Sequence, residues 1–350
     1  MTVGELGEFA LIRVLQGLLP ASGPEVLVGI GDDVAVLEGG RQDGLVWLAT
    51  CDVQVEGSHF LREAVAPEDL GRKVLAVNLS DIASAGGTPR FALVSLGLPR
   101  DLEAAFVEGL YRGLGQEAAR FGVQVVGGNV SRVPQGLFID LFLIGEAPRE
   151  EVLLRSGARP GDRILVTGTL GDAAAGVALL VGPSGRSPAG TRVPQEPFPV
   201  PQDYLLRATG RRDRPEPRVR EGRVIGASRL ATAMIDVSDG LAGDLGHLLQ
   251  CSGVGGRIEA SRLPVAPENR LLARATTGDE WHFALHGGED YELLFTCPPE
   301  AAGLLADRVR EATGTPVTDI GEVLEPGTPG GLLLPDGRLV EFGGGWDHFG

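Results

Sequence analysis

Apolar residues along this chain follow two periods, and the alternation between them predicts a protein that mixes strands with helices. A spacing of three to four residues, typical of a helix with one apolar face, recurs in several long segments. Shorter apolar runs between these segments are typical of buried strands. The predicted helices cover residues 4–19, 70–81, 102–121, 241–249 and 299–313, and a further helix begins at Asp172. The predicted strands cover residues 25–30, 45–53, 91–98, 123–126, 137–144, 163–167, 231–235, 256–260, 317–323 and 331–341.

The order of these elements predicts an α/β fold of the α+β kind, divided into two domains. Residues 146–162 contain prolines and glycines and interrupt the periodic pattern, which is typical of a domain joint. We therefore expect an N-terminal domain at residues 1–147 and a C-terminal domain at residues 148–350. Within the second domain, residues 181–222 are rich in Pro, Gly and Arg, and we expect an irregular surface excursion there.

The segment Asp236-Val-Ser-Asp-Gly240 lies between a predicted strand and a predicted helix and carries two carboxylates. Carboxylates at the end of a strand that face a helix N-terminus suit divalent cations and phosphate oxygens. A structural alternative is that Ser238 or Asp239 only caps the helix that follows. The segment alone leaves both interpretations open.

Aspartates also stand at four further strand ends or helix stripes. They are Asp32-Asp33, Asp52, Asp81 and Asp172. Asp81 falls on the apolar stripe of its predicted helix, where an unpaired carboxylate is costly, so we expect it to face a partner or a cation. If these groups converge, two charges about 4 Å apart repel by roughly 4 kcal/mol at an effective dielectric constant near 20. No arginine lies inside these motifs, so magnesium, which prefers oxygen ligands, is the expected occupant.

Composition narrows the classes of function. The chain has 350 residues and a formal net charge of -16, which argues against a nucleic-acid or anionic-membrane partner, because either needs a basic surface. Cys51, Cys251 and Cys297 are far apart, so neither a disulfide framework nor a zinc site is indicated. The chain shows no apolar run long enough to span a membrane and no signal-peptide pattern, and we expect a cytoplasmic protein.

Lys73 is the only lysine among the 31 basic residues. Its context, Gly71-Arg-Lys-Val74, lacks the Gly-Lys-Ser/Thr ending of a Walker loop, so that class of nucleotide-binding protein is excluded. The glycine-rich segments Gly127-Gly-Asn129 and Gly168-Thr-Leu-Gly171 have a phosphate-loop interpretation, but a hairpin turn and a packing turn explain them equally well. The residues by themselves predict a magnesium-dependent enzyme that acts on phosphorylated or nucleotide substrates.

Eight segments occur in the order and with the residues of a known family. They are Gly29-Ile-Gly-Asp-Asp-Val-Ala-Val36, Asp52-Val-Gln-Val-Glu-Gly-Ser-His-Phe60, Leu75-Ala-Val-Asn-Leu-Ser-Asp-Ile-Ala-Ser-Ala-Gly-Gly-Thr-Pro89, Gly127-Gly-Asn-Val-Ser131, Arg155-Ser-Gly-Ala-Arg-Pro-Gly-Asp162, Val166-Thr-Gly-Thr-Leu-Gly-Asp172, Ile235-Asp-Val-Ser-Asp-Gly-Leu241 and Gly287-Gly-Glu-Asp-Tyr-Glu292. Together they resemble the thiamine-monophosphate kinase family, within the superfamily of aminoimidazole ribonucleotide synthetase and selenophosphate synthetase. His59 and the terminal Trp-Asp-His-Phe point to the thiamine-phosphate branch.

The resemblance implies a two-domain synthetase-like fold and a homodimer in which the N-terminal mixed sheets meet. It implies direct transfer of the γ-phosphoryl group of ATP to thiamine monophosphate, assisted by several magnesium ions. Metal ligands are implied at Asp33, Thr50, Cys51, Asp52, Asp81, Asn129, Asp236 and Asp239. Within that set, the catalytic residues are Asp52, Asp81, Asp236 and Asp239. Nucleotide contacts are implied at Tyr111, Gly128, Asn129, Arg155 and Ser238, and substrate contacts at His59, Glu289 and Trp346.

Two positions depart from the family pattern. Asn129 stands where aspartate is common, which removes one negative charge. Cys51 stands where a hydroxyl residue is common, and because magnesium prefers oxygen to sulfur we expect any contact there from backbone atoms or from Thr50. His59 and Trp346 also have structural alternatives, as a strand-end histidine and as a core anchor. Two other functions compete with the kinase: a related ATP-dependent synthetase or maturation factor, and a non-catalytic magnesium–nucleotide binding module.

Overall fold

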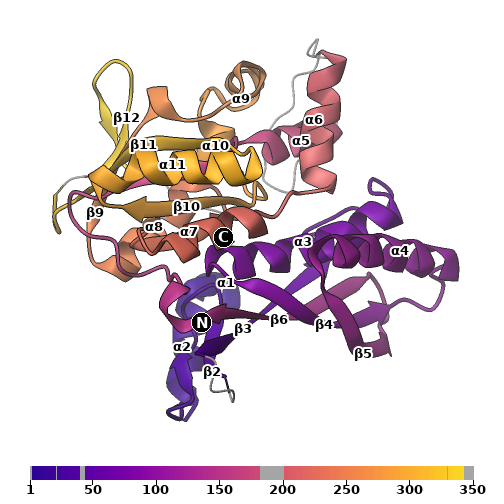
Figure 1. Cartoon of the computed structure of the whole chain (residues 1–350). Coiled ribbons are helices and arrows are strands. Elements are labelled where there is room, and N and C mark those ends of the chain that lie inside the picture. Colours follow the sequence, from indigo (N-terminus) through magenta and orange to yellow (C-terminus); the bar gives the residue numbers. More distant parts are fainter. Residues whose placement is uncertain (1, 21, 40–43, 182–200, 329, 343–350) are drawn as a thin grey trace.

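The computed structural model describes residues 2–20, 22–39, 44–181, 201–328 and 330–342, and it shows one mixed sheet in each half of the chain (Figure 1). The first sheet has the strand order β1-β2-β3-β6-β4-β5, and the second has the order β13-β12-β9-β11-β7-β10-β8. Most neighbouring strands are antiparallel, whereas β4 pairs with β5, and β9 with β12, in parallel. The predicted α/β fold is therefore confirmed.

Helices and strands alternate along the described chain much as the periodicity predicts. The strands of the first sheet are β1 (Val26–Val28), β2 (Ala35–Glu38), β3 (Leu45–Val55), β4 (Thr88–Leu98), β5 (Gln124–Arg132) and β6 (Phe138–Pro148). Those of the second are β7 (Arg163–Thr167), β8 (Ala233–Val237), β9 (Gly255–Glu259), β10 (Glu292–Cys297), β11 (Val317–Leu324), β12 (Gly331–Leu333) and β13 (Leu339–Val340). The first half contributes helices α1 (Val3–Leu6), α2 (Glu8–Leu18), α3 (Pro67–Ser84), α4 (Ala104–Phe121) and the 3-10 helix η1 (Arg149–Glu151). The remaining helices are α5 (Asp172–Val181), α6 (Gln202–Asp213), α7 (Val219–Ser228), α8 (Leu241–Ser252), η2 (Ala260–Arg262), α9 (Pro267–Thr277), α10 (His282–His286) and α11 (Pro299–Thr313).

None of the helices in the described part of the chain combines the length and the apolar character that a membrane span requires.

Helix α3 lies between the two sheets and is buried along most of its length (Figure 1). It contacts β3 and β6 of the first sheet, and α7, β8 and β10 of the second half. Its apolar residues Leu79 and Ile82 belong to one core cluster that also contains Met234 and Phe295 from the second sheet. Polar residues on α3 are therefore placed at the junction of the two halves.

Two glycines allow α3 to pack closely against α4. A Cβ atom at Gly71 would lie 1.9 Å from the carbonyl oxygen of Leu110, and one at Gly113 would lie 1.8 Å from that of Glu68. Such contacts are far shorter than any van der Waals separation, so larger side chains here would force the helices apart. The close approach of α4 therefore fixes the position of α3.

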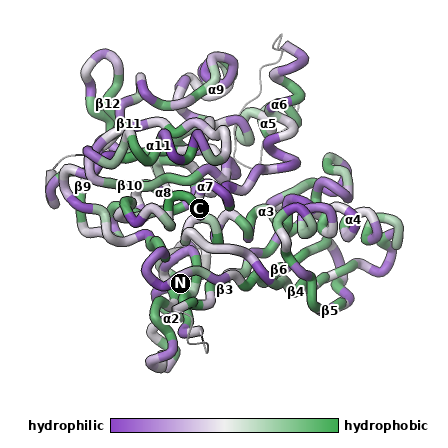
Figure 2. The backbone as a smooth tube through the Cα atoms, in the orientation of Figure 1, coloured by the Kyte–Doolittle hydropathy of each residue, from purple (hydrophilic) through white to green (hydrophobic). Residues whose placement is uncertain are grey.

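The expectation of an irregular excursion at residues 181–222 is wrong for its second part. Helix α6 and the start of α7 occupy it, while residues 182–200 lie outside the described residues. The buried stripe of α6 consists of Tyr204, Ala208 and Arg212, and Figure 2 shows this helix as largely hydrophilic. A stripe that contains an arginine escapes a search for apolar periodicity, although Arg212 is satisfied by the Gly176 carbonyl.

The strand predicted at residues 123–126 does not end at its glycines. Strand β5 continues through Gly127, Gly128 and Asn129 to Arg132, so the hairpin-turn and loop interpretations of this segment are wrong. A Cβ at Gly128 would lie 1.9 Å from the carbonyl oxygen of Val94 on the neighbouring strand. Here glycine marks a close approach between two strands rather than a turn.

Candidate active site

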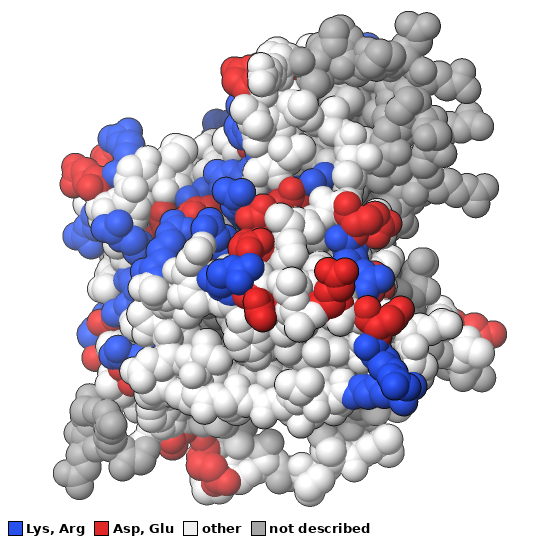
Figure 3. All heavy atoms as spheres, turned by 90° about the vertical axis from the view of Figure 1, so that its right-hand side faces the viewer, with Lys and Arg blue, Asp and Glu red and all other residues white. Residues whose placement is uncertain are grey.

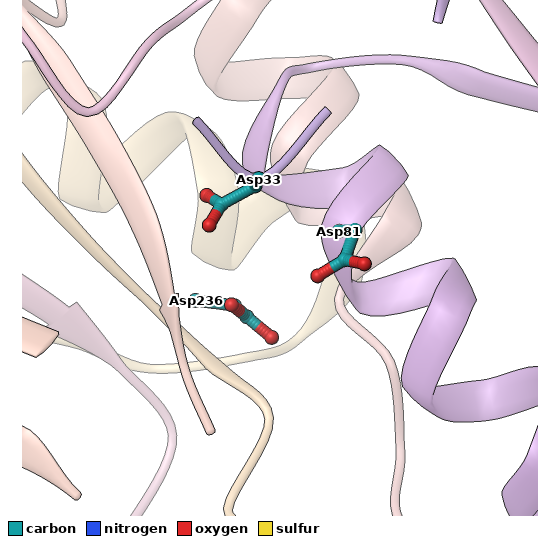
Figure 4. A group of neighbouring side chains, drawn as sticks. All are labelled: Asp33, Asp81 and Asp236. Carbon is teal, nitrogen blue, oxygen red and sulfur yellow. The ribbon is translucent and has the colours of Figure 1, made fainter. Parts of the chain in front are cut away.

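Three aspartates from distant parts of the chain converge at the junction between the halves (Figure 4). Asp33 lies just before β2, Asp81 lies near the end of α3, and Asp236 lies in β8. One carboxylate oxygen of each lies within 4.8 Å of those of the other two. Two halves of the chain must therefore meet before this acidic group exists.

Helix α3 orients two of these carboxylates through serines on either side of Asp81. The Ser80 hydroxyl donates to Asp236, and the Ser84 hydroxyl donates to Asp33 Oδ2 at 2.8 Å. Ser80 and Ser84 are four residues apart, so their side chains project from the same part of the helix surface. The apolar-looking stripe of α3 thus ends in a polar surface directed at the site.

Strand β3 also supports the site, through hydrogen bonds to residues of α3. The Thr50 hydroxyl donates to Asp81, and the backbone N–H of Asp52 donates to Asn78 Oδ1 at 3.1 Å. Asn78 in turn donates to the Val74 carbonyl within α3, at 3.1 Å. Because side chains alternate along a strand, Thr50 and Asp52 lie on the same face, toward α3.

Burial and mutual repulsion raise the pKa values of carboxylates in the acidic group. Burial, and then the charge of Asp33, raise the pKa of Asp236 to about 8. Burial, followed by Asp52, Asp236 and Asp33, raises the pKa of Asp81 well above its ordinary value. Carboxylates in this state either hold protons or bind a cation. An all-oxygen set of carboxylates and nearby hydroxyls fits a hard divalent cation such as magnesium.

An arginine compensates one of the carboxylates, which the sequence did not indicate. Arg155 Nε donates to Asp33 Oδ1 at 2.7 Å, and the backbone N–H of Arg155 donates to Asp32 Oδ2 at 3.2 Å. Burial and the charge of Asp33 nevertheless raise the pKa of Asp32 to about 6. No arginine lies inside the acidic motifs, but Arg155 reaches them from the connection between η1 and β7.

The segment after β8 is held by a residue that the sequence analysis did not select. The backbone N–H of Asp239 donates to Asp244 Oδ2, at 3.1 Å, and the Asp244 side chain is buried. Helix α8 has Gly240 as its N-cap and no side-chain cap, so the capping interpretation of Ser238 and Asp239 is wrong. Asp244 could have been identified from the sequence as an acidic residue in the first turn of the helix that follows Asp239.

Cys51 points away from the acidic group, on the opposite face of β3 from Thr50. Its thiol donates to Asp140 Oδ1 at 3.0 Å. Burial, and then the hydrogen bond and charge of Asp140, raise the pKa of this thiol to about 12. The thiol is therefore protonated, which fits the expectation that a contact at this position would not come from sulfur.

The residues expected to contact nucleotide lie in two places. Tyr111 on α4 lines a groove of about 730 Å³ together with Val130 of β5. Gly128 and Asn129 are exposed on β5, where Asn129 Nδ2 donates to Ser131 Oγ at 3.0 Å. Arg155, in contrast, lies beside the acidic group, where it donates to Asp33. Ser238 lies in the segment directly after β8.

The residues expected to contact the substrate are described in part. His59 Nδ1 accepts the backbone N–H of Val55 at 3.0 Å, which orders the turn after β3. Glu289 lies in the loop before β10, with its Oε1 2.5 Å from Lys73 Nζ. Trp346 lies outside the described residues.

Asp172 does not join the acidic group, although the sequence placed it among the strand-end aspartates. Its carboxylate accepts hydrogen bonds from the Thr169 hydroxyl and the Asn269 side chain, both at 2.8 Å. It is buried at the start of α5 and belongs to a polar cluster within the second half. Its partners satisfy it, so it stabilises the packing of α5 against α9.

Comparison with known families agrees with this architecture. The model of the AIR synthase related protein N-terminal domain matches residues 31–147, and that of the C-terminal domain matches residues 159–331. Each match contains most strands of one sheet, and the acidic group combines Asp33 and Asp81 from the first matched range with Asp236 from the second.

Individual relatives narrow the class. The thiamine-monophosphate kinase of Aquifex aeolicus is 38% identical over 349 residues, which cover 100% of both chains. That of Salmonella typhimurium is 37% identical over 348 residues, covering 98% of both. The solved structure described as AaThiL complexed with AMPPCP and TMP is 37% identical, with a TM-score of 0.80, and the match covers 99% of both chains. The chain belongs to the thiamine-monophosphate kinase family.

Proposed function

We propose that this protein transfers the γ-phosphoryl group of ATP to thiamine monophosphate and forms thiamine diphosphate. The observation that carries the proposal is the acidic group of Asp33, Asp81 and Asp236, which two halves of the chain assemble. Sequence identities of 38% and 37% to two thiamine-monophosphate kinases, over at least 98% of the chain, support it. So does the similarity to a structure described as bound to AMPPCP, an ATP analogue, and TMP.

We propose that magnesium ions bind at the acidic group. Asp33, Asp81 and Asp236 would supply the first ligands, with Asp52 and Asp239 beside them. Thr50 supports the site through its hydrogen bond to Asp81, and Asn129 would extend it on the first sheet. Bound magnesium supplies charge neutralisation for phosphoryl oxygens. The raised pKa of Asp236 and of Asp81 supports this assignment, because such carboxylates gain most from a cation.

The other residues of the site would bind and orient the two substrates. Tyr111, Gly128 and Asn129 would hold the nucleotide beside the groove on the first sheet, and Arg155 and Ser238 would contact its phosphates. His59, Glu289 and Trp346 would hold thiamine monophosphate.

The acceptor itself removes the need for a general base. A phosphate monoester has a second pKa near about 6, so its attacking oxygen is already largely ionised at neutral pH. The residues need only align the two phosphates in line and exclude competing water. The carboxylates at the junction would then serve as ligands rather than as proton acceptors.

We also propose that the protein is a homodimer built through the first sheet. Every residue of β5 is exposed, and Val126 and Val130 are 59% and 66% exposed. A strand that lies at the edge of its sheet and exposes valines favours association with another chain. Figure 3 shows a broad surface without charged side chains on the side where α4 and β5 lie in Figure 1. The division into domains at residues 147 and 148 and a cytoplasmic location also stay predictions.

The test is a product assay. The protein is incubated with ATP, magnesium and thiamine monophosphate, and thiamine diphosphate is measured by chromatography. We expect stoichiometric formation of ADP and thiamine diphosphate. Binding of ATP without any product, by folded protein, would favour a non-catalytic module. Product with a different acceptor alone would favour a related synthetase.

Asp239 provides a second test, because its assignment as a ligand depends on the proposal. We expect Asp239→Asn to abolish turnover while circular dichroism and thermal unfolding stay close to those of the unmodified protein. Near-normal activity would remove Asp239 from the set of ligands.

A further inference from the structure

The loop that leads from α10 into β10 has an unusual backbone. Glu289 and Tyr291 have φ angles of 71° and 50°, in the left-handed region that side chains other than glycine rarely adopt. The backbone N–H groups of these two residues donate to the carbonyls of Ser238 and Val237, both at 2.8 Å. The loop is thus held against the end of β8, which carries part of the acidic group, and something must maintain its conformation.

Lys73 reaches this loop from the other half of the chain. It lies on α3 and is only 3% exposed, and its Nζ is 2.5 Å from Glu289 Oε1. All the other residues among the 31 lysines and arginines are arginines. A compact ammonium on an unbranched stem suits a buried single-point contact that a planar guanidinium does not match. The only lysine of the chain therefore forms an ion pair between the two halves.

The negative charge of Glu289 acts on the same region as that of the proposed metal ligands. The side chain of Tyr291 is buried, and burial raises its pKa, with Glu289, Asp52, Asp236 and Asp239 adding to the shift. The charges of these four carboxylates therefore act together on this part of the junction. A further anionic group, such as the phosphate of a substrate, meets less repulsion there when Glu289 is paired with a cation.

We propose that Lys73 is a positioning residue for the transfer reaction. Its ammonium holds the Glu289 carboxylate and the strained loop in the conformation that receives thiamine monophosphate, and it offsets the charge that would repel the phosphate. Lys73 acts through Glu289 and does not itself touch the reacting atoms. This inference rests on the proposed function, since it assigns the loop to the substrate of that reaction.

The kinetic test uses Lys73→Met, Glu289→Gln and the double variant in the full-length protein. We expect each single change to raise KM for thiamine monophosphate by at least about tenfold. KM for ATP should stay within about twofold. The double variant should be no worse than the single ones, because both changes break the same contact. A KM for thiamine monophosphate within about twofold in either single variant, or effects that multiply in the double variant, would overturn the proposal.

A matched control removes a different ion pair between the same halves. Arg223 on α7 pairs with Glu151 of η1, 3.0 Å away, and also donates to the Gly86 carbonyl. Neither partner belongs to the loop before β10. We expect Arg223→Met to leave KM for thiamine monophosphate within about twofold, so that a general weakening of the junction is distinguished from loss of Lys73.

Hydrogen exchange gives a readout that is independent of activity. In Glu289→Gln, whose side chain is partly exposed and should not impair folding, we expect the amides of residues 288–291 to exchange at least about tenfold faster. Unchanged exchange in this variant would contradict a positioning role even if Lys73→Met does not fold. Failure of the unmodified protein to phosphorylate thiamine monophosphate would instead refute the proposed function, while the exchange result would still show whether Lys73 orders the loop.

Discussion

Two buried acidic groups in this protein compensate their charge in different ways. Glu292, only 1% exposed at the start of β10, accepts hydrogen bonds from Arg218 Nε and the Thr167 hydroxyl, both at 2.6 Å. Within the described residues, the group of Asp33, Asp81 and Asp236 has one guanidinium, from Arg155, for three carboxylates. The first is satisfied within the chain and stabilises the fold. The second keeps a deficit of positive charge, which supports the proposal that it binds a cation from solution.

The largest expected effect comes from the junction group. Asp236→Asn should lower kcat/KM by about four orders of magnitude, or about 5.5 kcal/mol of transition-state stabilisation, because it removes a proposed magnesium ligand. In metal-free buffer the free energy of unfolding should not fall, since one of three repelling carboxylates is gone. Steady-state assays and urea denaturation in the presence of a chelator measure the two quantities. A large loss of metal-free stability would make Asp236 a structural residue like Glu292.

The opposite result is expected at Glu292. Arg218→Met leaves the buried carboxylate with only the more distant Arg211, whose Nη2 is 4.0 Å from Glu292 Oε1, and should lower the free energy of unfolding by about 3–5 kcal/mol. Urea denaturation, with and without magnesium, gives the value. We expect the loss to be the same in both, because magnesium does not bind there. A variant that magnesium rescues would show that the two acidic groups are energetically linked.

The response to pH and magnesium distinguishes the two groups more finely. The pKa of Asp236 is about 8 in the folded protein, against about 3.9 for an unperturbed aspartate. The folded state therefore binds the extra proton, and metal-free stability should fall as the pH rises from about 4 to about 8.

Magnesium at the proposed site would compete with that proton. Its stabilising effect should therefore be larger near about pH 8.5 than near about pH 6, reaching about 2.7 kcal/mol at a hundredfold excess over Kd. Thermal unfolding with and without magnesium checks this, with Asp236→Asn as the control that should lose the pH dependence. An equal shift of Tm at both pH values would mean that magnesium does not displace a proton.

The sequence predicts the acidic group better than it predicts what surrounds that group. Asp81 stands out in the sequence because a carboxylate interrupts an apolar helical stripe. In the structure Asp81 does belong to the acidic group. Asp172 gives a similar local signal, yet Thr169 and Asn269 satisfy it elsewhere. Its partner Asn269 lies almost a hundred positions away, so only tertiary structure separates the two cases.

The same limit explains contacts that local patterns do not predict. Arg155 reaches Asp33 across 122 positions, and Lys73 on α3 reaches Glu289 in the loop before β10. No periodicity encodes such contacts, because they depend on how α3 packs between the halves. Helix α6 was missed for another reason: a buried arginine replaces part of its apolar stripe. Most strands and long helices therefore follow from local patterns, whereas elements such as β2, α9 and α10 were not predicted by any apolar period.

The smallest expected effects come from two hydroxyls that serve the two acidic groups in the same way. Ser80 donates to Asp236, and Thr167 donates to Glu292. Removing either donor, in Ser80→Ala or Thr167→Ala, should cost about 1 kcal/mol in the free energy of unfolding. Only Ser80→Ala should weaken magnesium binding, by about tenfold, because its hydroxyl orients a proposed ligand. Isothermal titration with magnesium and urea denaturation measure both quantities in each variant. If Thr167→Ala weakens magnesium binding as much, the distinction between a charge satisfied within the chain and one left for a cation does not hold.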